Sequence, residues 1–302
     1  MIPEFPEFKK LELSDREEIE SFTKKFPPYS DFNFVSMWSW DIKDEMALSV
    51  LNGNLVVKFT DYLSGDPFYS FIGTNQVTET AKALLLSSEN NDWEISLHLI
   101  PKDVAQHIST ENQDLSVLEK IDHHDYIYSV ESLVSFEGSL LKTQRNTLNS
   151  FTRKYPNFLA KVIDLSDPDI HFAILKLYKI WEINNNTNVP HEFLALKRCL
   201  TGAKKFNLFG LGIFINDELV GFNVNQKESE DFATCYFAKG NIKYSGVYSV
   251  LMNETAKVLS DVYSVKYYNY EQDLGLFNLR KSKKAFNPVY FLEKFSIIHT
   301  IK

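Results

Sequence analysis

The sequence predicts an α+β protein with two mixed central sheets, each flanked by helices. Alternating apolar runs and segments with helical spacing follow one another in a similar order in both halves of the 302-residue chain. Similar stretches also begin the two halves, "KKLELSDREEIESF" over 9–22 and "AKVIDLSDPDIHFA" over 160–173. Leu-Ser-Asp before a helix is a common capping pattern by itself, but the repeated order favours an internal duplication. We therefore expect one domain over 1–158 and a second over 159–302.

The composition is that of a soluble globular protein, with 44% apolar and 24% charged residues. A formal net charge of −8 excludes a global attraction to nucleic acid or anionic lipid. The N-terminus does not resemble a signal peptide and no window reaches 18 uninterrupted apolar residues, so we expect a cytoplasmic protein without a transmembrane segment. The two cysteines, Cys199 and Cys235, have no metal-ligand spacing, and we expect no metal site.

The first half begins with a predicted helix over 16–26, which follows a typical N-cap at Ser14-Asp15 and ends at two prolines. Alternating residues and turn signals identify the strands that follow, and helical spacing identifies the helices. In order, these are a helix over 32–40, a hairpin over 46–59, a strand over 67–74, a helix over 76–90, a strand over 94–100, a helix over 101–109, a strand over 125–136 and a basic helix over 139–155.

The second half repeats this order more clearly. Its first helix, over 167–183, has Ile170, Ile174 and Leu177 on one face, and a polar stretch over 184–191 interrupts it. The other predicted elements are a strand over 158–165, a helix over 192–206, a hairpin over 208–226, a strand over 231–240, a helix over 246–262, a strand over 264–273, a basic helix over 276–286 and a last strand over 288–300.

A glycine-containing loop joins a strand to a helix at "CYFAKGNIKYSGVYSVLMNE", residues 235–254. Glycine lets backbone N–H groups come close to a ligand, and the N-terminus of a helix favours an anion. Lys239 and Lys243 add positive charge on either side of this loop. We therefore expect a binding site for a phosphate, a pyrophosphate or a carboxylate around Gly246.

The order of hairpin, strand, glycine loop, helix and strand resembles the acyl-CoA N-acyltransferase (GNAT) fold, so the expected architecture is a tandem GNAT-like one. In that fold, a loop of pattern Arg/Gln-x-x-Gly-x-Gly/Ala binds the cofactor pyrophosphate. The equivalent residues here are Lys243, Gly246 and Tyr248. Tyr248 replaces a small residue and would crowd a bound pyrophosphate, which counts against ordinary acetyl-CoA binding.

The last ninety residues resemble a bacterial family of unknown function that is grouped with the C-terminal domain of phosphatidylglycerol lysyltransferases. Three family motifs are present: Asn-x-Glu-x-Asp-Leu-Gly over 269–275, Leu-Arg-Lys-x-Lys over 279–283, and Pro288 followed by Leu-Glu-Lys over 292–294. Upstream matches are Lys142, Arg145, Asn146, Glu192 and Ala195. The resemblance implies a tandem GNAT-like architecture, which these lysyltransferases share with peptidoglycan aminoacyltransferases that use aminoacyl-tRNA.

The motif "NYEQDLG" also has a chemical interpretation. On a strand, Asn269, Glu271 and Asp273 would point to one side, where buried polar groups need partners or a ligand. We expect Glu271 or Asp273 to orient or deprotonate an acceptor amine, with Arg280 and Lys283 close by to hold an anion. The alternative is an ion-pair network that only joins the last helix to the sheet. Arg145 is expected to reach the same site from the basic helix, unless its helical face is simply solvated.

Two functions follow from these residues. The first is an acyltransferase or aminoacyltransferase that takes its group from a thioester such as acyl-CoA, or from aminoacyl-tRNA. Its acceptor would be an amine or a lipid hydroxyl, and no covalently bound cofactor is expected. The alternative is a non-catalytic module that binds an anionic small molecule, a peptide or a phospholipid head group.

Overall fold

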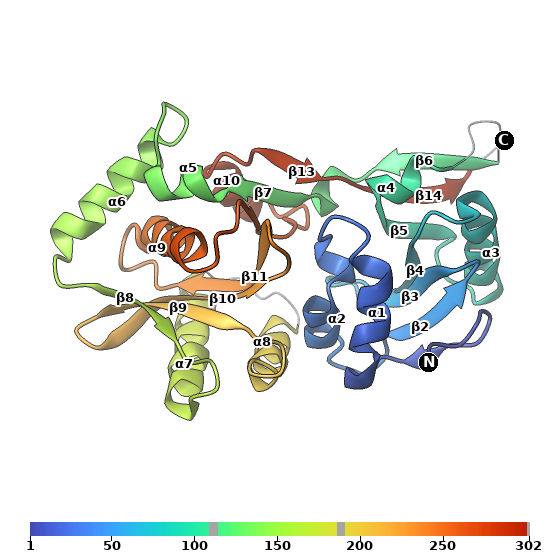
Figure 1. The fold of residues 1–302 in the computed structure, drawn as a ribbon, viewed down its shortest axis with the longest axis horizontal. Helices are drawn as coiled ribbons and strands as arrows, with labels where there is room; N and C mark the ends of the chain where they lie inside the picture. The colour runs from blue at the N-terminus through green and yellow to red at the C-terminus, as the bar shows by residue number, and fades with distance from the viewer. Residues whose placement is uncertain (109–113, 186–190, 301–302) are drawn as a thin grey trace. The chain divides into compact units, whose positions relative to one another are not determined.

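Strands from both halves of the chain build two separate seven-stranded sheets in the computed structural model, which describes residues 1–108, 114–185 and 191–300. One sheet belongs to a unit of Met1–Asp125 with Leu292–Lys302, and the other to a unit of Tyr126–Phe291. Each sheet is mixed and has helices packed on it (Figure 1). The tandem GNAT-like α+β fold that the sequence predicts is confirmed.

The first unit has the strand order β1-β2-β3-β4-β5-β14-β6. Neighbouring strands in this order pair antiparallel except β4 with β5, which pair in parallel and are joined by helix α3. The strands are β1 (Lys9–Lys10), β2 (Ala47–Leu51), β3 (Asn54–Thr60), β4 (Pro67–Ile72), β5 (Ser96–Pro101), β6 (Leu115–Glu119) and β14 (Lys294–His299). The α-helices are α1 (Arg16–Thr23), α2 (Phe34–Trp40), α3 (Val77–Asn90) and α4 (Lys102–Ala105).

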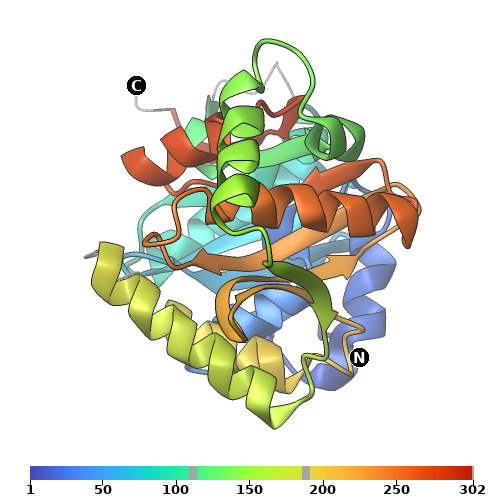
Figure 2. The ribbon, with the colours of Figure 1, turned by 90° about the vertical axis from the view of Figure 1, so that its left-hand side faces the viewer.

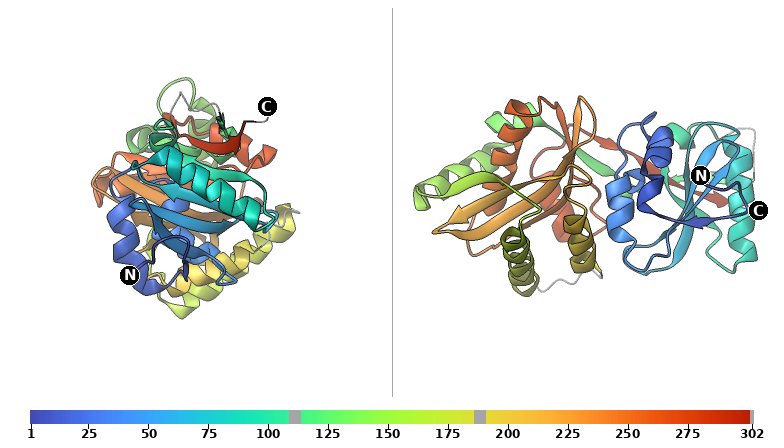
Figure 3. Two further views of the ribbon diagram at one scale, coloured as in Figure 1. Left: turned by 90° about the vertical axis from the view of Figure 1, so that its right-hand side faces the viewer. Right: turned by 60° about the horizontal axis from the view of Figure 1, so that its bottom comes forward.

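Helix α3 lies over one face of the first sheet, while α1 and α2 lie over the other (Figure 1, Figure 3). The alternating apolar residues that predict the hairpin β2–β3 fill the core, and Leu48, Leu55 and Val57 are fully buried. Asn33 begins α2 because its side-chain oxygen accepts hydrogen bonds from the backbone of Val35 and Ser36. Local capping and a buried apolar face therefore explain these elements.

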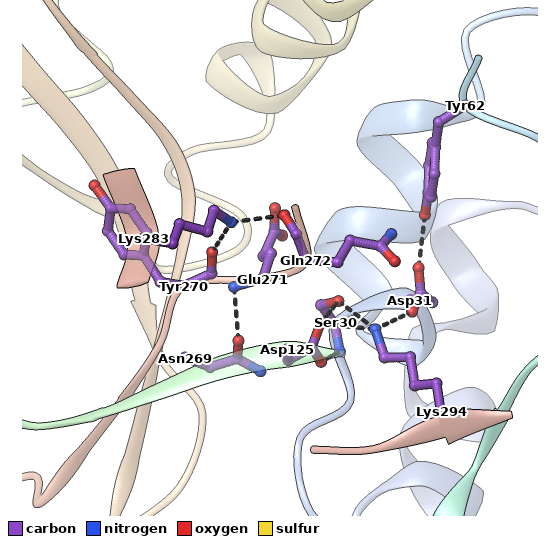
Figure 4. Close-up of polar contacts among 10 residues, drawn as sticks. All are labelled: Ser30, Asp31, Tyr62, Asp125, Asn269, Tyr270, Glu271, Gln272, Lys283 and Lys294. Carbon is purple, nitrogen blue, oxygen red and sulfur yellow. Dashed lines mark hydrogen bonds and ion pairs between the residues drawn. The ribbon is translucent and has the colours of Figure 1, made fainter. Parts of the chain in front are cut away.

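A buried ion cluster holds the C-terminal strand β14 in the first unit. The ammonium group of Lys294, only 1% exposed, donates a hydrogen bond to Asp31 and another, of 2.7 Å, to Asp125. The hydroxyl of Ser30 also donates to Asp125, at 2.6 Å. A lysine is buried only when it is paired, so this cluster fixes the position of β14 beside the segment around Asp31 (Figure 4).

The second unit has the strand order β13-β7-β12-β11-β10-β9-β8. Its parallel pair is β11 with β12, joined by helix α9. The strands are β7 (Asp125–Ser129), β8 (Leu159–Ile163), β9 (Phe209–Ile215), β10 (Glu218–Lys227), β11 (Phe232–Gly240), β12 (Tyr267–Asn269) and β13 (Tyr290–Leu292). The helices are α5 (Val130–Ser135), α6 (Lys142–Lys154), α7 (Pro168–Asn185), α8 (Glu192–Thr201), α9 (Val247–Asp261) and α10 (Phe277–Lys284).

Helix α9 covers one face of the second sheet and α7 covers the opposite face (Figure 2). Beneath α9 the core contains Met252 and Ala256 packed with Tyr268 and Cys235 of the strands. In a second apolar cluster, Val250 of α9 packs with apolar residues of β9 and with Phe151 of α6. Burial on both faces explains why β9 and β11 consist mostly of apolar residues.

The strand orders also divide the chain differently from the expected boundary after residue 158. The first sheet contains β14, from the C-terminal half, between β5 and β6. The second contains β7, from the N-terminal half, between β12 and β13. Each half therefore contributes one strand to the sheet of the other, and α6 lies entirely in the second unit. The two sheets have equivalent orders, but the internal duplication itself stays a prediction.

The following three predicted elements are among those that differ in the structure. Residues 125–136 form strand β7 followed by helix α5, because the Ser129 side chain accepts a hydrogen bond from the Ser132 backbone and starts a helix. Residues 288–300 form two strands that belong to different sheets. Residues 101–109 contain only the short helix α4; residue 109, like residues 186–190 of the polar stretch, lies outside the described residues.

The buried cluster predicts a large effect of Lys294→Ala on the stability of the first unit. The change leaves two buried carboxylates without their cation, so we expect the free energy of unfolding to fall by about 3–5 kcal/mol. Lys102→Ala, which breaks the 2.9 Å pair with Glu293 at a lysine that is 54% exposed, should cost about 1 kcal/mol or less. Urea denaturation of both variants measures this, and equal losses would contradict the structural role of Lys294.

Candidate functional site

Strands β11 and β12 pair in parallel over only three residues and then part. Phe232, Ala233 and Thr234 of β11 pair with Tyr267, Tyr268 and Asn269 of β12, where β12 ends. Strand β11 continues to Gly240 without β12 as a neighbour. The predicted strand over 264–273 is therefore shorter than expected, and Glu271 and Asp273 lie beyond its end. Their positions depend on the turn that follows and not on strand alternation.

A bulge in β11 lies next to this parting. Asn225 of β10 pairs with Cys235, and the next residue, Val224, pairs with Phe237, so Tyr236 is an additional residue in β11. The Tyr236 hydroxyl lies 2.6 Å from the side-chain oxygen of Gln226. Bulges change the direction of a strand, and this one is located where the two parallel strands separate.

Four polar contacts fix the segment over 270–272, called the turn over 270–272 here, and Figure 4 shows the three that involve Lys283 and Asn269. The Lys283 ammonium group donates to the carbonyl of Tyr270 and, at 2.7 Å, to the carbonyl of Gln272. The side-chain oxygen of Asn269 accepts a 2.8 Å hydrogen bond from the Glu271 N–H. The Glu271 carbonyl accepts a hydrogen bond from the Tyr126 N–H. The backbone on both sides of Glu271 is therefore held in a single conformation.

Glu271 itself has a backbone φ of 56°, in the left-handed region that few residues other than glycine adopt. Such strain is kept only where the surroundings impose it, and it is concentrated at functional sites. The side chain is half-buried. Burial is the main cause that raises the pKa of the Cys235 thiol to about 12, and the charge of Glu271 raises it further. Cys235 is therefore a neutral core residue and not a nucleophile.

Asp273 has a different environment from Glu271. Its two oxygens accept a bidentate pair of 2.8 Å hydrogen bonds from Arg280, with further bonds from the Tyr126 hydroxyl at 2.5 Å and from the Gly275 N–H. Burial raises the pKa of Asp273, but the hydrogen bonds from Arg280 and Tyr126 outweigh it, so the pKa is lowered. An acid held as its anion by these donors is a poor base, so the expected catalytic role fits Glu271 better than Asp273.

The glycine loop before α9 is covered by the protein's own side chains. The Gly240 N–H donates a 3.1 Å hydrogen bond to the Tyr248 hydroxyl. Burial is the main cause that raises the pKa of Tyr248 to about 12. Gly246, with a φ of 95°, packs against α6, and a Cβ there would approach Thr147 at 3.0 Å. Packing and backbone conformation explain both glycines, and Lys243 is exposed nearby.

Lys239 lies among aromatic and acidic side chains. Its ammonium nitrogen lies 2.7 Å from a carboxylate oxygen of Glu192 and 3.8 Å from the centre of the Trp181 ring. The other carboxylate oxygen of Glu192 accepts a hydrogen bond from the Tyr178 hydroxyl. The expected anion-binding role of Lys239 therefore does not fit its position, because its charge is already paired.

Arg145 also does not reach the residues around Glu271. One of its guanidinium nitrogens lies 2.6 Å from the carbonyl of Phe136, which ends helix α5, and 3.4 Å from the carbonyl of Gly138. These bonds satisfy carbonyls at a helix C-terminus, where a cation is favourable. Arg145 therefore caps the C-terminus of α5. The sequence suggests instead that Arg145 reaches the site around Glu271 or lies on a solvated helical face, and neither role fits these hydrogen bonds.

The sequence predicts Glu271, Asn269 and Lys283 as site residues. It does not reveal that Asn269 and Lys283 bind the backbone around Glu271. Lys283 holds backbone carbonyls, so its interpretation as an anion ligand is replaced by a positioning role. Trp181 and Tyr178 are missed as partners of Lys239, because no spacing connects α7 with β11. Their only signal is an aromatic pair at helical spacing, which a core also requires.

The family described as "Phosphatidylglycerol lysyltransferase, C-terminal" matches residues 24–298. The chain belongs to this family. The lysyltransferase C-terminal family is acyltransferase-like, and the match extends across both units of the structure. No curated protein sequence matches the chain.

Solved structures agree with this lysyltransferase-type fold. A conserved protein of unknown function from Bacteroides thetaiotaomicron is 24% identical, with a TM-score of 0.79, and the match covers 99% of this chain and 100% of that one. The C-terminal domain of a protein proposed to be a lysylphosphatidylglycerol synthetase, from Agrobacterium fabrum, is 11% identical with a TM-score of 0.66, covering 95% and 92%. The L-PGS protein of Bacillus licheniformis is 11% identical with a TM-score of 0.64, covering 100% and 95%.

None of the helices formed by residues 1–108, 114–185 and 191–300 combines the length and the apolar character needed to cross a bilayer. Within the same residues, no group of three or more His, Cys, Asp or Glu side chains is arranged to hold a metal ion.

The lowered pKa of Asp273 predicts a pH-dependent effect of Asp273→Asn. A carboxylate with a lowered folded pKa stabilises the fold above the ordinary Asp pKa of about 3.9, and this stabilisation is lost as the pH falls through the folded value. We expect the variant to be less stable at pH 7 by about 1.5–3 kcal/mol, and the difference to shrink towards pH 3.

Urea denaturation between pH 7 and pH 3 measures this difference. Asp217→Asn, a change at the exposed turn between β9 and β10, is the matched control. A difference between wild type and Asp273→Asn that stays constant over this range would contradict the assigned role of the Asp273 charge.

Proposed function

We propose that this protein transfers an acyl or aminoacyl group from a thioester or aminoacyl-tRNA donor to an amine or a lipid hydroxyl. Membership of an acyltransferase-like family supports the reaction class. The observation that carries the proposal is the turn over 270–272, which holds Glu271 at a φ of 56° by contacts on both sides. The donor and the acceptor are inferred from chemistry and from family membership.

Glu271 is the proposed general base. An amine is mostly protonated at neutral pH, and a positioned carboxylate removes one proton from the ammonium group, so that the nitrogen lone pair can attack the carbonyl carbon of the donor. The bond to the thiol sulfur or the ribose oxygen then breaks, and that atom takes up the second proton that the nitrogen gives up as the amide forms. A lipid hydroxyl would give its proton to Glu271 in the same way. Asn269 and Lys283 act as positioning residues, since they hold the backbone of the turn.

The donor is proposed to lie along β11, where this strand has no pairing with β12. The turn that carries Glu271 follows Asn269, and Asn269 pairs with Thr234, the residue directly before this part of β11. Between Cys235 and Gly240 the strand pairs with β10 on one edge only, and an extended donor chain is suited to the edge that β12 leaves.

One observation favours the alternative of a non-catalytic binding module. The Gly240 N–H already donates a hydrogen bond to the Tyr248 hydroxyl, and Gly246 packs on α6. Neither glycine is therefore open to a pyrophosphate. A donor without a pyrophosphate, such as aminoacyl-tRNA, is compatible with this arrangement. An anionic small molecule, peptide or phospholipid head group bound without turnover is the competing function.

The two functions differ in the response to Glu271→Gln. If Glu271 is the base, the variant loses transfer by about 10²–10⁴-fold, because the amide does not accept the proton. Donor consumption is measured with acetyl-CoA, longer acyl-CoAs and aminoacyl-tRNA as donors, and the midpoint temperature of unfolding, Tm, reports on the fold. Glu137→Gln, at an exposed position in the same unit, is the matched control and should transfer normally.

Wild-type protein that is stabilised by a donor or an anion but consumes no donor would support the binding module. Transfer that continues unchanged in Glu271→Gln would overturn the assigned base. A variant with normal Tm and lost transfer is the result that the proposed enzyme requires.

A further inference from the structure

Lys239 occupies a site built like a receptor for an ammonium ion. Its charged nitrogen lies 3.8 Å from the centre of the Trp181 ring and 5.8 Å from that of Tyr178, with the Glu192 carboxylate at 2.7 Å. Aromatic faces attract a cation through the ring quadrupole, and a carboxylate adds a charge-assisted hydrogen bond. The combination of Trp181, Tyr178 and Glu192, called the ammonium box below, supplies both.

The ammonium box is held by contacts that do not involve Lys239. The Tyr178 hydroxyl donates to Glu192 at 3.1 Å, and the rings of Tyr178 and Trp181 lie 5.5 Å apart. Trp181 is also hydrogen-bonded to the Tyr248 hydroxyl, a bond that lowers the otherwise raised pKa of Tyr248. The receptor side is therefore fixed by α7, α8 and α9, while its occupant comes from β11.

The ion pair inside the ammonium box is mostly withdrawn from water. The side chains of Lys239 and Glu192 are 11% and 12% exposed, whereas the pair of Lys266 with Asp231 in the same unit is 70% and 49% exposed. A carboxylate at that depth needs a cation, since an uncompensated buried charge is costly. Removing the lysine should therefore leave a site that takes up another ammonium ion.

We propose that the ammonium box is a primary-ammonium site which the chain fills with its own Lys239, and that this occupant makes the transferase select acyl groups with an uncharged side chain over those with a cationic side chain. The inference rests on the proposed function, since the donor is proposed to lie along β11, where Lys239 directly precedes Gly240. A cationic acyl side chain on that strand would meet the Lys239 charge, while the Glu192 charge is already paired with Lys239.

The receptor part is tested by chemical rescue of Lys239→Ala. The substitution removes three methylene groups and the nitrogen, which correspond to n-propylammonium. We expect n-propylammonium chloride to raise the Tm of this variant saturably, by about 2–4 °C beyond sodium chloride at equal ionic strength. Wild type should not respond, and neither should Lys266→Ala, which breaks the exposed pair with Asp231. Adding Glu192→Gln to Lys239→Ala should abolish the response.

The receptor is overturned if Lys239→Ala gives no saturable response, or if Lys266→Ala responds equally. Should Lys239→Ala not fold, proton NMR of the wild type keeps the receptor testable. The ε-methylene protons of one lysine should be shifted upfield by the Trp181 ring, and this shift should be absent in Trp181→Leu. Lysine signals without such a shift would contradict the occupied box.

The selectivity part is tested with tRNA charged with alanine or with lysine. We expect wild type to transfer alanine at least tenfold faster than lysine, and Lys239→Ala to lose this preference, because Glu192 then pairs with the lysyl ammonium group. Transfer with unchanged selectivity in Lys239→Ala would overturn this part. If wild type transfers neither group from any donor, the proposed function fails and the selectivity fails with it, while the rescue experiment still decides the receptor.

Discussion

The candidate site depends on two hydrogen bonds that the Lys283 ammonium group donates to the backbone carbonyls of Tyr270 and Gln272. A buried cation bonded to two backbone carbonyls fixes the chain between them, and that segment contains Glu271 in a left-handed conformation. Without this contact the turn after β12 would relax towards a less strained backbone, and the Glu271 carboxylate would lose its fixed position. Asp273 and Arg280 then anchor the next segment with a bidentate pair.

The general architecture could be predicted because it is written in local patterns. Alternating residues, helical spacing and capping residues specify strands and helices through neighbours in the sequence, and the repeated order identifies two sheets. The exchange of β7 and β14 between the sheets could not be predicted, because strand pairing between distant segments leaves no local signal. The same reason explains why the domain boundary was expected near residue 158 and not at Asp125.

The sequence predicts which residues form the candidate site better than it predicts the contacts that these residues make. Glu271, Asn269 and Lys283 were selected because acidic, amide and basic groups follow one another at the end of a strand. Their roles depend on a turn that the sequence does not reveal, since a glutamate rarely has a positive φ. The glycine loop was expected to bind an anion, but the decisive partners, Tyr248 and α6, reach the glycines only after folding.

A crystal structure with a non-hydrolysable aminoacyl-tRNA end analogue tests the central claim most directly. The account predicts that the analogue lies against residues 235–240 of β11, with its carbonyl carbon beside the Glu271 carboxylate and the turn over 270–272 unchanged. An analogue bound at saturating concentration in the first unit, or one that displaces the turn and leaves Glu271 without contact to it, would contradict the account.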